Sequence, residues 1–295
     1  MSVEMMTSRF QYVRPRSLKD ALNFLDAHGP HTSILAGGTD LMISIRRGAL
    51  TPKFVMDVSR LEELRVAEKL DGHLSVGAAL TYTEIMNYPT IVELAPVLAL
   101  ASSFVGSLQI RNVGTLGGNI SNASPASDAV TALMVHDAQV EVLSAKTSRM
   151  VPLNEFITSP YRTTLKPGEL ITRLLLETFE KNYRFTFQRI ARRRALSIAR
   201  INLAAVGQID SRGLVSDFRL SVGSITPQPA RMTRAEDILK GVLPDRNLVM
   251  ETAKKVSQEM VSRSGVRPST EYKRPAVEGL VIKSLTKILL EYIYQ

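Results

Sequence analysis

The chain has 295 residues, of which 44% are hydrophobic and 22% are charged, a balance typical of a globular protein with a substantial core. No apolar run reaches the length of about 18 residues that a transmembrane helix needs, and the absence of cysteine excludes disulfides and Cys-bound clusters. The formal net charge of +9 favours anionic partners.

The first part of the chain is expected to form a β-α-β unit. Ser17 begins a predicted capping box, and the helix that follows should end at Gly29. An apolar run at residues 32–36 predicts a strand, residues 41–47 predict a helix, and the alternating residues 54–58 predict a second strand.

A second unit is expected to begin near residue 74. It combines predicted strands with predicted helices: strands at 74–76, 138–143 and 170–176, and helices at 83–88, 96–104 and 128–134. Asp128 is well placed to cap the last of these helices.

Beyond Thr178 the predicted elements are strands followed by helices. The strands are expected at 185–190, 198–209 and 214–222, and the helices at 233–239, 248–261 and 277–293. This order indicates an α+β domain with an antiparallel meander. We place the domain boundary near residues 177–182.

Two glycine-rich stretches, residues 35–41 and 106–128, each contain a Gly-Gly pair near a threonine. A glycine costs roughly 1 kcal/mol inside a helix, so residues 106–128 are not expected to form a regular helix. Glycine does allow backbone N–H groups to approach a ligand, and two such loops suggest two walls around one phosphate-bearing molecule. Neither loop has the spacing of a dinucleotide fingerprint or a P-loop, and from these residues alone plain turns explain them equally well.

Basic residues gather in one region of the sequence, at Arg189, Arg192, Arg193, Arg194 and Arg200. A nucleic-acid site would need interleaved aromatic side chains for stacking, and few are near. We therefore predict contact with an anionic subunit or a phosphate and no nucleic-acid binding. No Ser-His-Asp order, paired carboxylates or metal-ligand spacing stands out, so no catalytic or metal-binding side chain is predicted.

The segments ILAGGTDLMI and QIRNVGTLGGNISNASPASD resemble the FAD-binding medium subunit of the molybdenum hydroxylases, a family that includes xanthine, nicotinate and carbon monoxide dehydrogenases. The resemblance covers nearly the whole chain, because three later segments also match: ARRRALSIARINLAAVG, GSITPQPARMTRAEDILKG and RPSTEYKRPAVEGLVIKSL.

This resemblance implies a mixed α/β fold with two domains. Residues 1–178 would form an FAD-binding domain of the vanillyl-alcohol-oxidase type, with subdomains at about 1–60 and 61–178. Residues 179–295 would form a C-terminal α+β domain with an antiparallel sheet and helices.

The resemblance also implies the residues that hold FAD. They are Ile34, Leu35, Ala36, Gly37, Gly38, Thr39, Asp40, Leu41, Gly106, Thr115, Leu116, Gly117, Gly118, Asn119, Asp128, Ile171 and Arg189. The two glycine loops would hold the pyrophosphate, Asp128 would accept hydrogen bonds from cofactor hydroxyls, and Ile171 would place its backbone by the isoalloxazine ring. Arg189 and Ser197 stand where relatives have lysine and aspartate, which leaves the flavin's properties open.

Simpler structural roles compete with several of these assignments. Asp128 could cap a helix, Ile171 could be a core residue of a strand, and Arg189 could be a solvated member of the basic cluster. Asp40 is an awkward neighbour for a phosphate, so we expect it to accept local backbone N–H bonds. A Cβ at Gly117 should intrude on the pyrophosphate, and Gly117→Val should lose flavin while the chain stays folded.

The function that the resemblance implies is that of an FAD-binding electron-transfer subunit in a multi-subunit molybdenum hydroxylase. A small subunit with [2Fe–2S] clusters and a large molybdopterin subunit would complete a heterotrimer, which would form a dimer. Electrons would reach FAD and then an external acceptor such as NAD⁺. The first residues lack a signal-peptide layout, so we expect a cytoplasmic location.

The substrate of the whole enzyme is undetermined, because another chain would select it. Two alternatives remain: a self-contained FAD oxidoreductase of related fold, and a non-catalytic assembly or scaffold subunit that has lost flavin. The branch of benzoyl-CoA-type reductases is disfavoured, because its extra cluster needs cysteines that this chain lacks.

Overall fold

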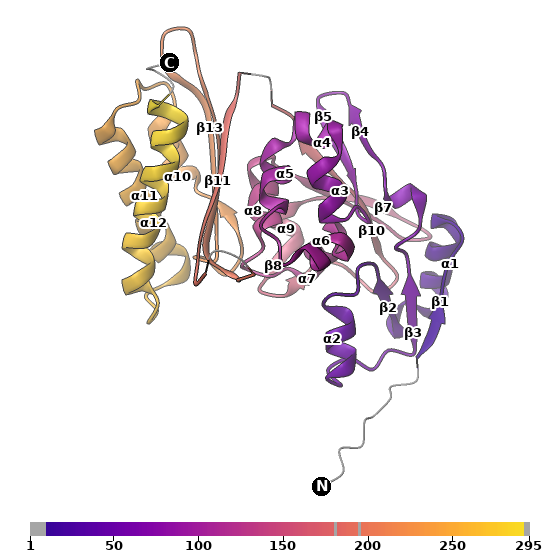
Figure 1. The fold of residues 1–295 in the computed structure, drawn as a ribbon. Coiled ribbons are helices and arrows are strands. Elements are labelled where there is room, and N and C mark those ends of the chain that lie inside the picture. Colours follow the sequence, from indigo (N-terminus) through magenta and orange to yellow (C-terminus); the bar gives the residue numbers. More distant parts are fainter. Residues whose placement is uncertain (1–9, 180–181, 194–195, 292–295) are drawn as a thin grey trace.

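The computed structural model describes residues 10–179, 182–193 and 196–291. Three main sheets follow one another across the molecule, from the N-terminal part to the C-terminal helices (Figure 1). Their strand orders are β1-β3-β2, β4-β5-β10-β6-β7 and β11-β12-β13-β14. The predicted mixed fold, with helices and both parallel and antiparallel strands, is confirmed.

The N-terminal sheet is parallel and contains the predicted β-α-β unit. Its elements are β1 (Gln11–Val13), α1 (Leu18–His28), a 3-10 turn (Gly29–His31), β2 (Thr32–Leu35), α2 (Leu41–Arg46), β3 (Phe54–Asp57) and a second 3-10 turn (Glu62–Leu64). Strand β3 pairs in parallel with both β1 and β2. The hydroxyl of Ser17 accepts a hydrogen bond from the Asp20 amide at 3.1 Å, which caps α1, but the described residues do not show the reciprocal bond of the predicted capping box.

The central sheet is antiparallel, with β10 in its middle. Its strands are β4 (Ala67–Leu70), β5 (His73–Gly77), β6 (Gln139–Leu143), β7 (Ser148–Pro152) and β10 (Leu170–Glu177). A separate two-stranded sheet consists of β8 (Ile157–Ser159) and β9 (Arg162–Thr163). The three predicted strands of this region are confirmed. The edge strands β4 and β7 were not predicted, because alternating polar edge residues give a weak hydrophobic pattern.

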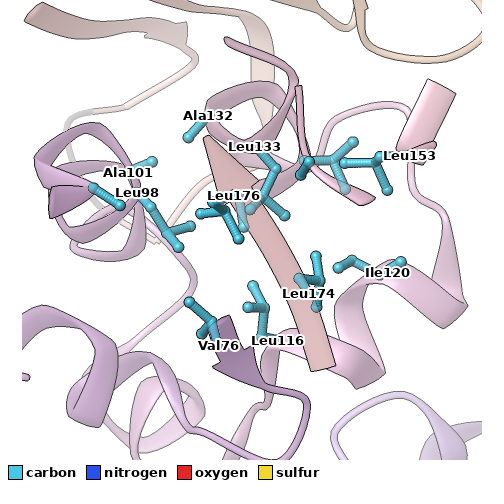
Figure 2. Close-up of a cluster of buried hydrophobic side chains, with 14 of the residues drawn as sticks. Val76, Leu98, Ala101, Leu116, Ile120, Ala132, Leu133, Leu153, Leu174 and Leu176 are labelled. Atoms are coloured by element: carbon cyan, nitrogen blue, oxygen red, sulfur yellow. The ribbon is translucent and has the colours of Figure 1, made fainter. Parts of the chain in front are cut away.

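Short helices cover the central sheet and bury its core. They are α3 (Tyr82–Asn87), α4 (Pro89–Leu94), α5 (Pro96–Ser102), α6 (Leu108–Val113), α7 (Leu116–Asn122), α8 (Asp128–Val135) and α9 (Leu153–Phe156). Figure 2 shows Leu174 and Leu176 of β10 at the centre of this core, with Leu98 of α5 and Leu133 of α8 directed toward them. Burying one such side chain stabilises the fold by about 1.5–3 kcal/mol.

The glycine-rich stretch is helical, which corrects our prediction. It contains α6 and α7, and Gly117 and Gly118 lie inside α7. The hydroxyl of Thr115 caps α7 by accepting from the Gly118 amide at 3.3 Å. Tertiary packing and this cap outweigh the low helix propensity of glycine.

Helix α8 is capped by a different residue from the one predicted. The hydroxyl of Ser127 accepts a hydrogen bond from the Val130 amide at 3.1 Å, and Asp128 is already the first helical residue. The prediction that Asp128 caps this helix is therefore wrong. Every residue of α8 is buried, since it packs on the central sheet and also on β12 and β13.

The C-terminal part is an antiparallel meander with helices on one face, as predicted. Its elements are β11 (Arg184–Ala191), β12 (Ala199–Ile209), β13 (Val215–Gly223), β14 (Ala230–Arg231), α10 (Thr233–Leu239), α11 (Arg246–Ser264), α12 (Thr270–Leu285) and a π-helical turn (Thr286–Leu290). Helix α12 starts at Thr270 and not at residue 277, because Pro275 lies inside it and does not begin it. The predicted end at residue 293 lies outside the described residues.

Ion pairs join the C-terminal sheet to the preceding part of the chain. Arg219 of β13 lies 3.0 Å from Asp137 and 2.8 Å from Glu177, and Arg231 of β14 lies 2.6 Å from Asp137. These contacts fix how β13 and β14 lie against the end of α8. The domain boundary near residues 177–182 stays a prediction, and residues 180–181 are outside the described part.

Candidate functional site

A cavity of about 640 Å³ lies where the N-terminal sheet meets α7 and β10. Most of the cofactor-binding residues that we predicted from the sequence line it. Those that line it are Ile34, Ala36, Gly37, Gly38, Thr39, Asp40, Leu41, Thr115, Gly117, Gly118, Asn119 and Ile171. We call it the first cavity.

The loop between β2 and α2 forms one wall of the first cavity and offers free donors. No acceptor among the described residues takes a hydrogen bond from the backbone amides of residues 38–41. Gly38 has a φ of +70°, a conformation that glycine adopts without the penalty of a side chain. Four successive amides without a protein acceptor, beside a cavity, are donors that an anion could use.

Helix α7 forms the opposite wall, and its amides are already used. The amide of Leu116 donates to Leu80 O at 3.0 Å and that of Gly117 to Ala78 O at 2.8 Å. The amide of Gly118 donates to the hydroxyl of Thr115, and the amide of Asn119 donates to the carbonyl of Thr115. The two loops therefore do not offer equivalent backbone donors, contrary to our expectation.

The glycines of both walls also serve close packing. A Cβ at Gly37 would lie 2.0 Å from Val113 O, and a Cβ at Gly117 would lie 2.7 Å from the Cβ of Ala78. The Gly117 position thus faces the protein. A side chain there would press on Ala78, so we now expect Gly117→Val to disturb packing, and its loss of flavin stays a prediction.

Asp40 does not shape its turn as predicted. It is the N-cap residue of α2, but its side chain makes no hydrogen bond to the helix. Its carboxylate accepts from Thr39 Oγ1 at 3.3 Å and from Asn122 Nδ2 at 3.4 Å. Asn122 thus links the two walls. We did not predict this residue from the sequence, although it lies in the polar segment NISNAS, which could have indicated a polar site.

A second cavity, of about 1130 Å³, adjoins the first and shares Asp40, Asn119 and Asn122 with it. Gly106, Asp128 and Arg189 line this second cavity and not the first. Gly106 has a φ of +51° in the turn before α6. The seventeen implied residues thus divide between two neighbouring cavities, apart from Leu35 and Leu116, which line neither.

A buried polar cluster forms one wall of the second cavity. Asp128 Oδ2 lies 2.7 Å from Arg189 Nη1, and Asp128 Oδ1 accepts from Asn202 Nδ2 at 2.7 Å. Arg189 also donates to the carbonyls of Phe104, at 2.8 Å, and Ser197. The Arg189 side chain is 8% exposed, so the alternative of a solvated arginine is wrong.

The charge state of Asp128 reflects opposing effects. Burial raises the pKa of its carboxyl above the ordinary value, and the contacts with Asn202 and Arg189 act in the opposite direction. A buried carboxylate held by two donors keeps a fixed orientation. It can present its remaining lone pairs to hydroxyl groups in the cavity.

Ile171 is a core residue of β10 that also lines the first cavity. It is 4% exposed, and its predicted place beside the isoalloxazine ring stays a prediction. The pairing register of β10 with β6 shifts between Ile171 and Arg173, which marks a bulge there. Bulges redirect the backbone at sites where a strand meets a ligand.

The described residues contain neither a candidate metal site nor a candidate membrane-spanning helix. No group of three or more His, Asp or Glu side chains is placed to hold a metal ion in the described ranges. Likewise, none of the helices described is long and apolar enough to cross a membrane. Arg194 of the basic cluster lies outside the described residues.

Comparison with known proteins places the chain in a family. Residues 8–176 match the model of the FAD binding domain in molybdopterin dehydrogenase. Residues 186–288 match the model of the CO dehydrogenase flavoprotein C-terminal domain.

Characterised relatives match over almost their full length. The glyceraldehyde dehydrogenase medium chain of Sulfolobus acidocaldarius is 32% identical, over 96% of this chain and 100% of the relative. The nicotinate dehydrogenase FAD-subunit of Eubacterium barkeri is 30% identical, over 95% of this chain and 96% of the relative. Quinoline 2-oxidoreductase from Pseudomonas putida 86 has the same fold, with a TM-score of 0.88 and 24% identity over 97% of this chain and 99% of that one.

The chain belongs to the family of FAD-binding medium subunits of the molybdenum hydroxylases and is an oxidoreductase subunit.

Proposed function

We propose that this chain binds FAD across the two cavities and transfers electrons through it. The observation that carries the proposal is the row of free amides at residues 38–41, beside the edge that the two cavities share. The pyrophosphate of FAD is the elongated anion that such a row suits. Of the seventeen implied residues, the fifteen that line the cavities are proposed to surround the cofactor.

Asp128 and Arg189 are proposed to face the flavin end of the cofactor. The carboxylate of Asp128 would accept hydrogen bonds from cofactor hydroxyls. Arg189 would favour negative charge on the reduced flavin, but Asp128 lies 2.7 Å away and offsets part of that charge. FAD itself supplies the one- and two-electron chemistry, and the chain supplies position and electrostatics.

We propose that the electrons come from [2Fe–2S] clusters on a small partner subunit, which receives them from molybdopterin on a large subunit. Helix α6 supports this arrangement, because Leu108, Ile110 and Val113 are 58%, 37% and 47% exposed on one short helix. Exposed apolar side chains at that density favour a protein contact. Ile110 lines both cavities, so a subunit on α6 would stand next to the cofactor.

We propose a cytoplasmic dimer of heterotrimers in which FAD reduces an external acceptor such as NAD⁺. The names of the relatives support the multi-subunit arrangement, since one is a medium chain and another an FAD-subunit. Glyceraldehyde and nicotinate dehydrogenases are both among them, so the substrate of the assembly stays open.

The test is the visible spectrum of the purified chain and of its native complex, followed by identification of the extracted chromophore. We expect the absorbance of oxidised flavin and about one FAD per chain, as a single site of this kind would hold. A colourless chain that takes up no added FAD would overturn the proposal and favour a scaffold subunit. Flavin bleached by substrate in the isolated chain would favour a self-contained oxidoreductase.

A further inference from the structure

Three strands of the C-terminal sheet place three residues side by side against the start of α8. Arg189 of β11 lies opposite Asn202 of β12, which lies opposite Gly223 of β13. Residues directly opposite each other in antiparallel strands carry their side chains on one face of the sheet. Here that face meets α8, and both Asp128 and Thr131 of this helix contact Asn202. The sheet therefore places a cation and an amide at the same helix end.

The side-chain amide of Asn202 is completely buried, and all of its polar groups have partners. Its nitrogen donates to Asp128 Oδ1 at 2.7 Å and to the Ala126 carbonyl at 3.4 Å, and its oxygen accepts from Thr131 Oγ1 at 2.9 Å. A flipped amide would turn its oxygen toward the carboxylate, so that two acceptors would face each other. The contact with Asp128 therefore fixes the amide in one orientation.

Gly223 leaves the space that this arrangement needs. A Cβ at Gly223 would lie 2.2 Å from Asn202 Oδ1 and 2.4 Å from Thr131 Oγ1. Neither Asn202 nor Thr131 lines a cavity, whereas Asp128 and Arg189 line the second cavity. Asn202 therefore acts on a ligand in that cavity through its contacts, the shortest of which is the bond to Asp128.

The charge of Asp128 depends on a small set of neighbours. Burial raises the pKa of its carboxyl, while the Asn202 amide and the Arg189 guanidinium act in the opposite direction. Tyr82 of α3 is also near this charge. Burial and the charges of Asp128 and Asp40 raise the pKa of the Tyr82 phenol well above its usual range, so the phenol stays neutral. An amide does not titrate, and Asn202 thus donates to Asp128 at every pH.

We infer that Asn202, held by Thr131, is a positioning residue that keeps Asp128 an oriented, ionised acceptor beside the bound FAD. The inference rests on the proposed function, in which Asp128 accepts hydrogen bonds from cofactor hydroxyls. A buried carboxylate that loses its amide donor binds a proton more readily. A protonated Asp128 would offer fewer lone pairs to the cofactor, and it would no longer offset the charge of Arg189. Asn202 thereby influences both the affinity for FAD and the reduction potential of the flavin.

The first measurement compares Asn202→Leu with the unmodified chain. FAD should bind about tenfold more weakly in a fluorescence titration, since a hydrogen bond to a charged group is lost. The reduction potential of the flavin in the FAD-loaded complex should move to a more positive value, because Arg189 then favours the reduced anion more strongly. Loosened packing alone would weaken FAD binding without raising this potential.

A double-mutant cycle tests whether Asn202 acts through Asp128. In the Asp128→Ala background, Asn202→Leu should lose most of its effect on FAD affinity. Thr131→Val removes the hydroxyl that holds the amide and should weaken FAD binding about threefold.

Thr252→Val is the matched control for Thr131→Val. Both hydroxyls belong to fully buried residues, and each bonds the carbonyl four residues earlier in its helix, at 3.1 Å for Thr131 and 2.8 Å for Thr252. Thr252 lies on α11 and lines neither cavity, so its variant should keep the affinity for FAD.

Asn202→Asp tests the same role with a side chain of nearly the same size, and it remains decisive if Asn202→Leu does not fold. Two carboxyls at this distance share one proton at lower pH, which restores a donor to Asp128, and they repel each other once that proton is lost. The dissociation constant for FAD should therefore be near that of the unmodified chain at about pH 6 and rise about tenfold by about pH 9. In the unmodified chain it should stay constant over this range.

The outcomes separate this inference from the proposed function. An unmodified chain that holds no FAD and takes up none defeats the proposed function. Equal FAD affinity and equal reduction potential in the unmodified chain and Asn202→Leu defeat only the inference. A full effect of Asn202→Leu in the Asp128→Ala background, or pH-independent FAD binding by Asn202→Asp, would also overturn it.

Discussion

Residues 37–41 and residues 115–119 each combine a Gly-Gly pair with a threonine. The two segments differ in whether their backbone amides have hydrogen-bond acceptors within the protein. The amides of residues 38–41 are free in the described structure, whereas those of residues 116–119 all donate to protein acceptors. The first segment joins a strand to a helix at a cavity edge, and the second begins a helix packed on Ala78 and Leu80. Glycine in such a motif can thus provide a donor for a ligand or permit contact between two backbone segments.

The largest expected effect comes from Gly117→Val. The new Cβ would lie 2.7 Å from the Cβ of Ala78 and 2.9 Å from its carbonyl oxygen, so helix α7 must move away from the central sheet. We expect the free energy of unfolding to fall by about 3 kcal/mol, measured by urea denaturation of the FAD-free chain.

Gly118→Ala is the matched control for Gly117→Val. A Cβ at Gly118 would approach only the Thr115 hydroxyl, at 2.9 Å, and alanine favours a helix over glycine by about 1 kcal/mol. Its stability should therefore change little. If Gly117→Val folds as stably as the unmodified chain while losing FAD, the packing role assigned here to Gly117 is wrong.

Much of the fold could be predicted because its elements have local signals. The Ser17 cap, the alternating residues of β6 and the apolar run of β10 all depend on neighbours in the sequence. Helices α6 and α7 could not be predicted in this way. Gly117 is tolerated in a helix because Ala78, almost forty residues earlier, occupies the space of its side chain.

The candidate site shows the same limit. Its residue types were recognisable in two segments, but hydrogen-bond partners decide what those residues do, and they come from elsewhere in the chain. Arg189 looked like part of an exposed basic cluster, and its burial depends on Asp128 and Phe104. Arg200 and Lys273 are 73 positions apart in sequence, so nothing local indicated that they line one cavity.

A second prediction concerns the free amides. Gly38→Ala places a side chain at a φ of +70°, which costs about 1–2 kcal/mol. The loop should relax by turning its amides, and FAD should bind about tenfold more weakly in a fluorescence titration, as expected when one hydrogen bond to an anion is lost.

Gly48→Ala is the control that separates strain from binding. Gly48 has the same φ of +70°, nothing lies within 4 Å of its new Cβ, and it does not line either cavity. It should show the same backbone strain without the contact that a Cβ at Gly38 would make with Leu35 Cδ1 at 2.9 Å, and it should keep its FAD affinity. Equal FAD affinity in both variants would remove the amides of residues 38–41 from the binding site.

The smallest expected effect tests the opposite wall. Thr115→Ala removes the hydroxyl that accepts from the Gly118 amide, and loss of such a cap costs about 1 kcal/mol. Because the amides of Leu116 and Gly117 keep their acceptors in the central sheet region, the helix should stay in place. The urea midpoint should therefore fall slightly while the dissociation constant for FAD stays the same. A several-fold loss of FAD affinity with unchanged stability would mean that this threonine donates to the cofactor. The two glycine segments would then share the ligand in the way that their sequences suggested.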